Sequence, residues 1–395
     1  MGHSTPSRRE FLKACTAAGI AMPGIAAAAG ICAARTGEAA ENALPLRGRA
    51  GKIVEARYYT PLDAGRIQCM LCPHGCEVAP GERGDCGVRE NRGGTYYTLV
   101  YGNPCSGYDG GMPDPIEKKP LFHFLPGTKA YSIACAGCNV RCLFCQNWQI
   151  SQARPEQTHN FDLPPAGVVV NARKHECRSI AFTYSEPTVF YEYMYDTAKL
   201  GREQNIRSVM ISNGYISAAP MQALCEHLGA VKIDLKAYTD EFYSKIVGGS
   251  LRHVVNTLKL LKEAGTWFEI VYLVIPTLND NMPDIRSMCK WMADELGAMV
   301  PLHFTAFYPT YKLQNLPRTP AATLEAARNT AMAEGLKYVY VGNVWTRGGH
   351  DGESTWCHNC GKRIIHRSGY RIINTHITNG ACEYCGAQIP GVWKE

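Results

Sequence analysis

Short β-rich segments alternate with helical patterns from Lys129 onward, and this alternation is the feature that most limits the fold. Strands separated by helices are typical of βα units, whose strands lie parallel in one sheet. The predicted strands are Tyr131–Cys135, Ser179–Tyr184, Ser208–Ser212, Val231–Leu235, Glu269–Val274 and Leu302–Phe307. The predicted helices cover residues 166–175, 188–204, 218–228, 253–264, 282–296 and 320–335. Six βα units over about 210 residues predict an α/β fold. Because a complete TIM barrel has about eight such units, we expect a partial TIM-like (β/α)6 barrel.

Polar motifs fall at the carboxyl ends of the predicted strands, where function gathers in such barrels. Glu186 follows the second strand, and Ser212 and Asn213 follow the third. Asp234 and Lys236 stand at the end of the fourth, where we expect only one of them to face the interior. A carboxylate, a hydroxyl and an amide suit a charged, nucleotide-like ligand. Each site also has a structural interpretation. Glu186 is then an acid at the barrel rim, Asn213 with Gly214 forms a turn, and Asp234 with Lys236 forms a structural ion pair.

Three cysteines, Cys138, Cys142 and Cys145, follow the first predicted strand. Iron–sulfur clusters usually take four cysteine ligands, so a cube held by three thiolates leaves one iron open to another ligand. We predict a cluster of this kind on the loop. A zinc knuckle and a chance grouping of cysteines are the alternatives.

Two further groups account for eight of the eighteen cysteines. In a chain of this length, pairs spaced as C-x2-C indicate metal sites more than a disulfide framework. The first cysteine group consists of Cys69, Cys72, Cys76 and Cys86. It is predicted to hold a structural zinc ion or a second iron–sulfur cluster. The C-terminal cysteine group consists of Cys357, Cys360, Cys382 and Cys385. It predicts a zinc ribbon, and a rubredoxin-like iron site is the alternative.

The amino terminus has the pattern of an export signal. The run Ser7–Lys13 reads Ser-Arg-Arg-Glu-Phe-Leu-Lys and precedes a mildly apolar stretch, rich in alanine and glycine, over residues 14–34. Paired arginines before such a stretch predict twin-arginine export to the periplasm or cell envelope. The alternative is an amphipathic helix of a cytoplasmic protein.

Charge and hydropathy exclude two classes of partner. The chain has a net charge of +6, but its lysine and arginine residues are scattered and form no long run. We therefore expect no nucleic-acid partner. Beyond the amino terminus no stretch approaches the roughly 18 apolar residues of a membrane span, so the mature chain is not expected to cross a membrane. The expected organisation is a signal segment and linker over 1–40, a cysteine-rich module over 50–115, the barrel over 116–345 and a C-terminal module over 346–395.

The order of the motifs supports a closer identification. Residues 60–395 resemble the pyruvate formate-lyase-activating-enzyme-like branch of the radical S-adenosylmethionine (SAM) enzymes, and within it the AmmeMemoRadiSam-system enzymes. The spacing of Cys138, Cys142 and Cys145 is similar to the C-x3-C-x2-C signature of that family. The other matching segments are Cys72–His74, Lys119–Gly127, Gly137–Asn139, Cys145–Trp148, Tyr184–Thr188, Ile233–Lys236, Ile275–Asp280 and His303-Phe304.

This resemblance implies a [4Fe–4S] cluster on the three cysteines, whose open iron binds the amino and carboxylate groups of SAM. One electron then splits SAM to a 5′-deoxyadenosyl radical, so the cofactor carries the difficult chemistry. Glu186 stands where the family has an acid after two glycines, but this chain lacks the glycine pair. Ser212, Asn213 and Asp234 match positions near SAM in activating enzymes.

The same resemblance implies partners. An electron donor of the flavodoxin or ferredoxin type is expected, together with proteins of the AmmeMemoRadiSam system. His123 and His303 are either acids on the substrate side of the site or packed histidines. The rival hypothesis is a non-catalytic iron–sulfur or zinc protein that carries electrons or docks partners.

Overall fold

The computed structural model describes residues 52–344 and 351–394. The predicted twin-arginine segment, with Arg8 and Arg9, lies outside the described residues. No helix in the described part of the chain is long and apolar enough to cross a membrane.

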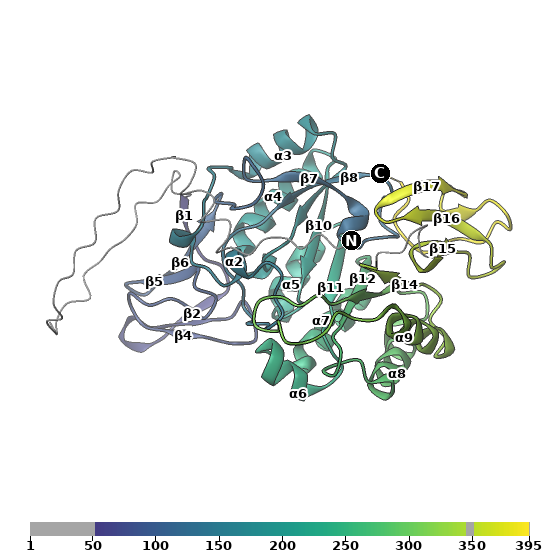
Figure 1. The fold of residues 1–395 in the computed structure, drawn as a ribbon. Helices are drawn as coiled ribbons and strands as arrows, with labels where there is room; N and C mark the ends of the chain where they lie inside the picture. Colours follow the sequence, from purple (N-terminus) through teal and green to yellow (C-terminus); the bar gives the residue numbers. More distant parts are fainter. Residues whose placement is uncertain (1–51, 345–350, 395) are drawn as a thin grey trace, which may run out of the picture. The chain divides into compact units, whose positions relative to one another are not determined.

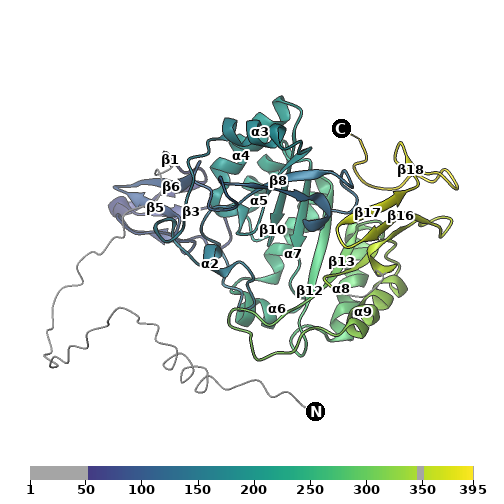
Figure 2. The ribbon, with the colours of Figure 1, turned by 45° about the horizontal axis from the view of Figure 1, so that its top comes forward.

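Within the described residues the main sheet has eight strands in the order β14-β13-β12-β11-β10-β9-β8-β7 (Figures 1 and 2). Strands β8 to β14 are parallel, and β7 pairs antiparallel with β8. Their bounds are β7 Met112–Pro115, β8 Lys129–Ile133, β9 Ser179–Phe182, β10 Arg207–Ser212, β11 Ala230–Asp234, β12 Phe268–Val274, β13 Leu302–Ala306 and β14 Val339–Gly342. Because β7 and β14 are not paired with each other, the barrel is open, which confirms the predicted α/β partial barrel.

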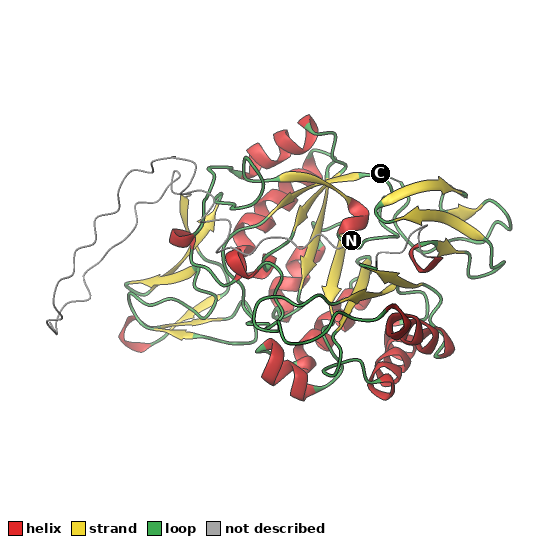
Figure 3. Ribbon diagram, viewed as in Figure 1, coloured by secondary structure: helices red, strands yellow, loops and turns green. Residues whose placement is uncertain are grey.

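Helices follow the parallel strands, as predicted, and are drawn in red in Figure 3. Their bounds are α2 Trp148–Ser151, α3 Pro165–Lys174, α4 Tyr191–Glu203, α5 Ala218–Cys225, α6 Asp240–Phe242, α7 Leu251–Glu263, α8 Met282–Trp291 and α9 Ala321–Ala333. In α7 the residues Val254, Leu258 and Leu261 are buried, and this spacing of four and three residues gives the helix one apolar face. Two predicted helices are composite, because a 3-10 turn precedes α4 and a π-helical turn follows α8.

The segment 116–127 fills the amino-terminal part of the concave face of the sheet, and we call it the floor segment. Its side chains Leu121 and Phe124 belong to one buried apolar cluster with strand residues of β8 to β11. Those strand residues are small or β-branched, namely Ala130, Ala181, Val209 and Ala230. Small side chains at neighbouring register positions leave the space that the floor segment occupies, as close packing requires.

The N-terminal module, residues 52–111, consists of two small antiparallel sheets. One has the order β1-β6-β5 and the other β2-β3-β4. Their bounds are β1 Lys52–Glu55, β2 Tyr59–Pro61, β3 Ile67–Cys69, β4 Glu77–Val78, β5 Arg89–Arg92 and β6 Thr95–Tyr101. A buried ion pair joins this module to helix α4: Arg89 donates to both carboxylate oxygens of Glu192, at 2.9 and 2.8 Å.

The C-terminal module, residues 351–394, is built from short antiparallel strands. Their bounds are β15 Thr355–Trp356, β16 Arg363–Ser368, β17 Arg371–Thr375, β18 Ile377–Thr378 and β19 Ala381–Cys382. The buried Arg367 donates to the Phe122 carbonyl at 2.8 Å, and the backbone of Val392 pairs with Leu125 and His123 at 2.7 Å each. These hydrogen bonds attach the C-terminal module to the floor segment.

Candidate functional site

The loop of residues 134–147 leaves the carboxyl end of β8 and carries Cys138, Cys142 and Cys145; we call it the Cys138 loop. Backbone hydrogen bonds hold it in place, from Arg141 N to Val247 O at 2.8 Å and from Leu143 N to Ile246 O at 3.0 Å. Its conformation is therefore fixed by neighbouring elements, as a ligand-binding loop requires.

Asn213, at the end of β10, connects the next strands to this loop. Its Nδ2 donates to Asn139 Oδ1 at 2.9 Å and lies 3.9 Å from the sulfur of Cys138. Asn139 in turn donates to the Tyr215 carbonyl at 2.6 Å. The structure thus brings the predicted Asn213 and Cys138 into contact.

Glu186 is buried behind the same loop. Its Oε1 accepts hydrogen bonds from Thr188 N, Thr188 Oγ1 and Ser212 Oγ at 3.0, 2.7 and 2.7 Å. Its Oε2 accepts one from Asn213 N at 2.9 Å. Burial raises the pKa of Glu186, and these donors oppose that rise. The carboxylate therefore positions Ser212 and Asn213, and Oε2 keeps one lone pair for a further donor.

Asp234, at the end of β11, lies between two lysines. Lys232 Nζ donates to Asp234 Oδ1, and Lys236 Nζ lies 3.5 Å from Oδ2. Burial alone would raise the pKa of Asp234, but the two lysines overcome this and hold it below the ordinary value. The expectation that only one of Asp234 and Lys236 faces the interior is wrong, because side chains two residues apart on an extended chain point to the same side.

The C-terminal cysteine group has the spacing of a single-ion site. The sulfur–sulfur distances are 3.6 Å for Cys357 and Cys385 and 3.8 Å for Cys360 and Cys382, and all four sulfurs lie within 4.8 Å of one another. A tetrahedron with metal–sulfur bonds of about 2.3 Å has edges of about 3.8 Å. This group could therefore hold a metal ion.

Comparison with known proteins identifies the family. Residues 132–289 match the family model of the Radical SAM superfamily, and this range contains the Cys138 loop, Glu186, Asn213 and Asp234. The chain is also 46% identical over 337 residues to the uncharacterized protein MJ0808 of Methanocaldococcus jannaschii, covering 85% of this chain and 98% of that protein. The chain belongs to the radical SAM superfamily.

The chain is also similar to more distant proteins. This radical SAM protein is 27% identical over 160 residues to a pyruvate formate-lyase-activating enzyme of Clostridium pasteurianum, covering 39% of this chain and 65% of that enzyme. A solved radical SAM methyltransferase from Sphaerobacter thermophilus aligns with a TM-score of 0.46 and 18% identity, covering 57% of this chain and 68% of that one. Members of the superfamily are enzymes, and membership implies a [4Fe–4S] cluster and SAM.

Near Lys232 this radical SAM protein has an ionic cluster that the sequence motifs did not reveal. Lys119 Nζ donates to Asp114 Oδ2 at 2.7 Å, and the Tyr184 hydroxyl donates to the same carboxylate. Burial lowers the pKa of Lys119 to about 8, although Asp114 opposes the change. The three residues come from β7, the floor segment and the loop after β9, so no local pattern could have predicted their contact.

The two histidines that were candidates for a substrate-side role are packed at the amino-terminal ends of the strands. His303 Nε2 lies 2.7 Å from Glu269 Oε2, and His123 lies 2.6 Å from the Tyr340 hydroxyl and 2.7 Å from the Pro390 carbonyl. Both imidazoles are buried. Their partners within the fold support the structural interpretation.

The burial of His123 predicts a loss of stability in acid. Burial lowers the pKa of His123 to about 4, against an ordinary value of 6.5, so the unfolded chain binds the proton more tightly. Stability should therefore be complete above about pH 6.5 and fall as the pH falls toward 4, with a loss of about 2 kcal/mol from pH 7 to pH 5. Urea unfolding at both pH values measures this. In His123→Gln this loss of stability between pH 7 and pH 5 should become smaller, whereas replacing the exposed His159 should leave it unchanged. The same loss of stability in His123→Gln as in the wild-type protein would show that His123 does not cause it.

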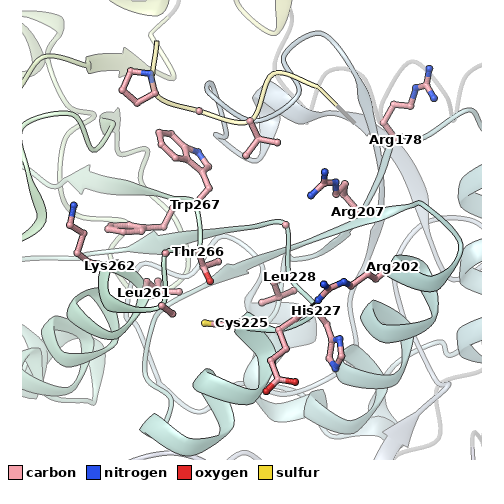
Figure 4. Close-up of a pocket in the computed structure, with 18 of the residues that line it drawn as sticks. Arg178, Arg202, Arg207, Cys225, His227, Leu228, Leu261, Lys262, Thr266 and Trp267 are labelled. Carbon is pink, nitrogen blue, oxygen red and sulfur yellow. Dashed lines mark hydrogen bonds between the residues drawn. The ribbon is translucent and has the colours of Figure 1, made fainter. Parts of the chain in front are cut away.

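A wide groove of about 1840 Å³ opens at the amino-terminal ends of β10, β11 and β12. Arg178, Arg202 and Arg207 line one side, and Trp267 lines another (Figure 4). The Cys138 loop follows the opposite, carboxyl end of β8. This groove is therefore separate from the candidate site.

Proposed function

We propose that this protein cleaves SAM reductively. When bound, a [4Fe–4S] cluster on Cys138, Cys142 and Cys145 would supply the electron that converts SAM to a 5′-deoxyadenosyl radical, which abstracts hydrogen from a substrate. The observation that carries the proposal is the contact of the Cys138 loop with Asn213, whose backbone in turn is held by Glu186.

The chemistry of the donor set fits the cofactors. The three cysteines are free thiols, and Cys142 is buried, so water has limited access to the ligand. The free lone pair of Glu186 Oε2 suits the SAM ammonium group. The Ser212 hydroxyl donates to Glu186 and the Asn213 amide donates to Asn139, so these two side chains would hold the carboxylate and the Cys138 loop in place beside SAM. Asp234 would hold a further polar part of SAM, with Lys232 and Lys236 keeping it ionised.

The finer assignment is to an activating-enzyme-like member that works in the AmmeMemoRadiSam system. The motif order and the relatedness to pyruvate formate-lyase-activating enzymes support it. A flavodoxin-like or ferredoxin-like protein would deliver the electron. We propose zinc for the C-terminal cysteine group, where it would stabilise that module.

The test is anaerobic reconstitution of the full chain with iron and sulfide, followed by addition of dithionite and SAM. Chromatography should detect 5′-deoxyadenosine and methionine in equal amounts. Protein with a fully loaded cluster that releases neither product would instead favour the rival function, a non-catalytic carrier of electrons.

We also propose export by the twin-arginine route, on the pattern at Arg8 and Arg9. Replacing both arginines with lysine keeps the charge but removes the guanidinium groups. The variant should accumulate as precursor inside the cell, as fractionation and immunoblotting would show. An unchanged distribution would contradict export and favour the cytoplasmic alternative.

A further inference from the structure

The first cysteine group lies on two loops of the N-terminal module that converge. Cys69 ends β3, and its backbone nitrogen donates to the Cys76 carbonyl at 2.9 Å. The Cys72 carbonyl accepts a hydrogen bond from Gly75 N at 3.1 Å, which turns this loop back toward Cys76. A Cβ added at Gly84, two residues before Cys86, would lie 3.8 Å from the Cys76 sulfur. The four thiols therefore share one partly buried region, as the ligands of one centre must.

This region lies directly against the Cys138 loop. His74, inside the first cysteine group, makes a hydrogen bond of 2.6 Å from its Nε2 to the Asn139 carbonyl. A Cβ added at Gly137 would lie 2.9 Å from the Cys86 carbonyl and 2.6 Å from Val88, so only glycine permits the approach. Cys86 and Cys138 also line one hollow of about 830 Å³. The two sets of thiols are thus adjacent.

The first group differs from the C-terminal group in its spacing. Among the described residues, sulfur–sulfur contacts of 3.6 and 3.8 Å are found in the C-terminal group and not in the first group. Thiolates that bind one ion must approach to about 3.8 Å, whereas thiolates on different irons of a cluster stand further apart. The spacing therefore fits a single ion in the C-terminal group. The first group offers the four cysteine ligands that an iron–sulfur cluster usually takes, and it lies against the Cys138 loop.

We infer that Cys69, Cys72, Cys76 and Cys86 hold a second iron–sulfur cluster, which passes one electron to the cluster on the Cys138 loop. This inference rests on the proposed function, because it supplies the electron that SAM cleavage consumes. A flavin or iron–sulfur protein is oxidised by one electron and the second cluster is reduced. The second cluster then returns to its oxidised state as the cluster on the Cys138 loop is reduced. No bond forms or breaks in the relay.

The first measurement needs no variant. Full-length protein, reconstituted anaerobically with iron and sulfide, should contain about six to eight iron atoms and about one zinc per chain. Electron paramagnetic resonance of the dithionite-reduced protein should show two clusters whose signals broaden each other. About four iron atoms with two zinc ions, or two clusters without magnetic interaction, would overturn the inference.

The second measurement compares two electron sources. Reduction of the cluster on the Cys138 loop is followed by stopped-flow absorbance with reduced ferredoxin and, separately, with dithionite. In Cys72→Ala/Cys76→Ala the ratio of the ferredoxin rate to the dithionite rate should fall about tenfold or more. The matched variant Cys177→Ala/Cys289→Ala removes two buried thiols outside the three cysteine groups and should keep the wild-type ratio.

The outcomes separate this inference from the proposed function. An unchanged ratio in Cys72→Ala/Cys76→Ala, with its iron lost from the first group, would overturn the relay while leaving SAM cleavage intact. Absence of SAM cleavage in wild-type protein that contains both clusters would overturn the proposed function instead. If Cys72→Ala/Cys76→Ala does not fold, the iron content and the magnetic interaction of the wild-type protein still decide.

Discussion

Replacing Cys142 with alanine is expected to abolish formation of 5′-deoxyadenosine. Cys142 is buried in the middle of the Cys138 loop, and its loss leaves Cys138 and Cys145 to hold a cube that needs three thiolates. The rate should fall below about a thousandth of the wild-type rate, which corresponds to about 4 kcal/mol in the activation barrier. Chromatography measures the product, and visible absorbance measures the cluster.

Cys135 provides the matched control, because it is buried just upstream and its thiol donates to the Val100 carbonyl at 3.5 Å. Cys135→Ala should keep the cluster and the product. Wild-type levels of product from Cys142→Ala, or loss of the cluster from Cys135→Ala alone, would contradict the ligand assignment.

The largest expected change in stability follows replacement of Glu192 with alanine. The variant leaves the Arg89 guanidinium buried without its carboxylate, and breaking a buried pair in this way costs about 3–5 kcal/mol. Arg57 N would also lose its acceptor, which lies 2.6 Å away on Glu192 Oε1. Urea unfolding followed by circular dichroism measures the free energy.

Two further variants make this prediction specific. Replacing both partners with apolar residues, as in Arg89→Met/Glu192→Leu, should recover much of the loss, because no charge then remains buried. Glu241→Ala removes the exposed partner of Lys245 and should leave the unfolding curve unchanged. A stable Glu192→Ala protein would show that water reaches Arg89.

Much of the barrel could be predicted from the sequence, because each strand–helix unit is specified by local periodicity. The six predicted strands correspond to β8 to β13. Strand β7 contains Pro113 and Pro115, and its pairing with β8 is not local, so it was missed. Strand β14 has only four residues and lies at the end of the predicted barrel region, 116–345, where no strand was predicted.

The candidate site was predictable as a set of residues but not as a set of contacts. Spacing alone identified the Cys138 loop, and strand ends identified Glu186 and Asn213. Glu186 accepts hydrogen bonds from Ser212 and Asn213 because the loops after two neighbouring strands fold toward each other. The hydrophobic periodicity of the sequence carries no information about the paths of these loops. The same holds for Asp114 and Tyr184, which are 70 positions apart in the chain.

The hydrogen bond from His123 to Pro390 has a consequence for synthesis of the chain. The two residues are 267 positions apart, so His123 leaves the ribosome long before its partner exists. Domains generally fold as units as they emerge during translation, and contacts between distant residues form late. The amino-terminal end of the barrel, around His123, would therefore stay open to water until residues near 390 arrive, whereas the Cys138 loop lies at the opposite end and does not wait for this contact.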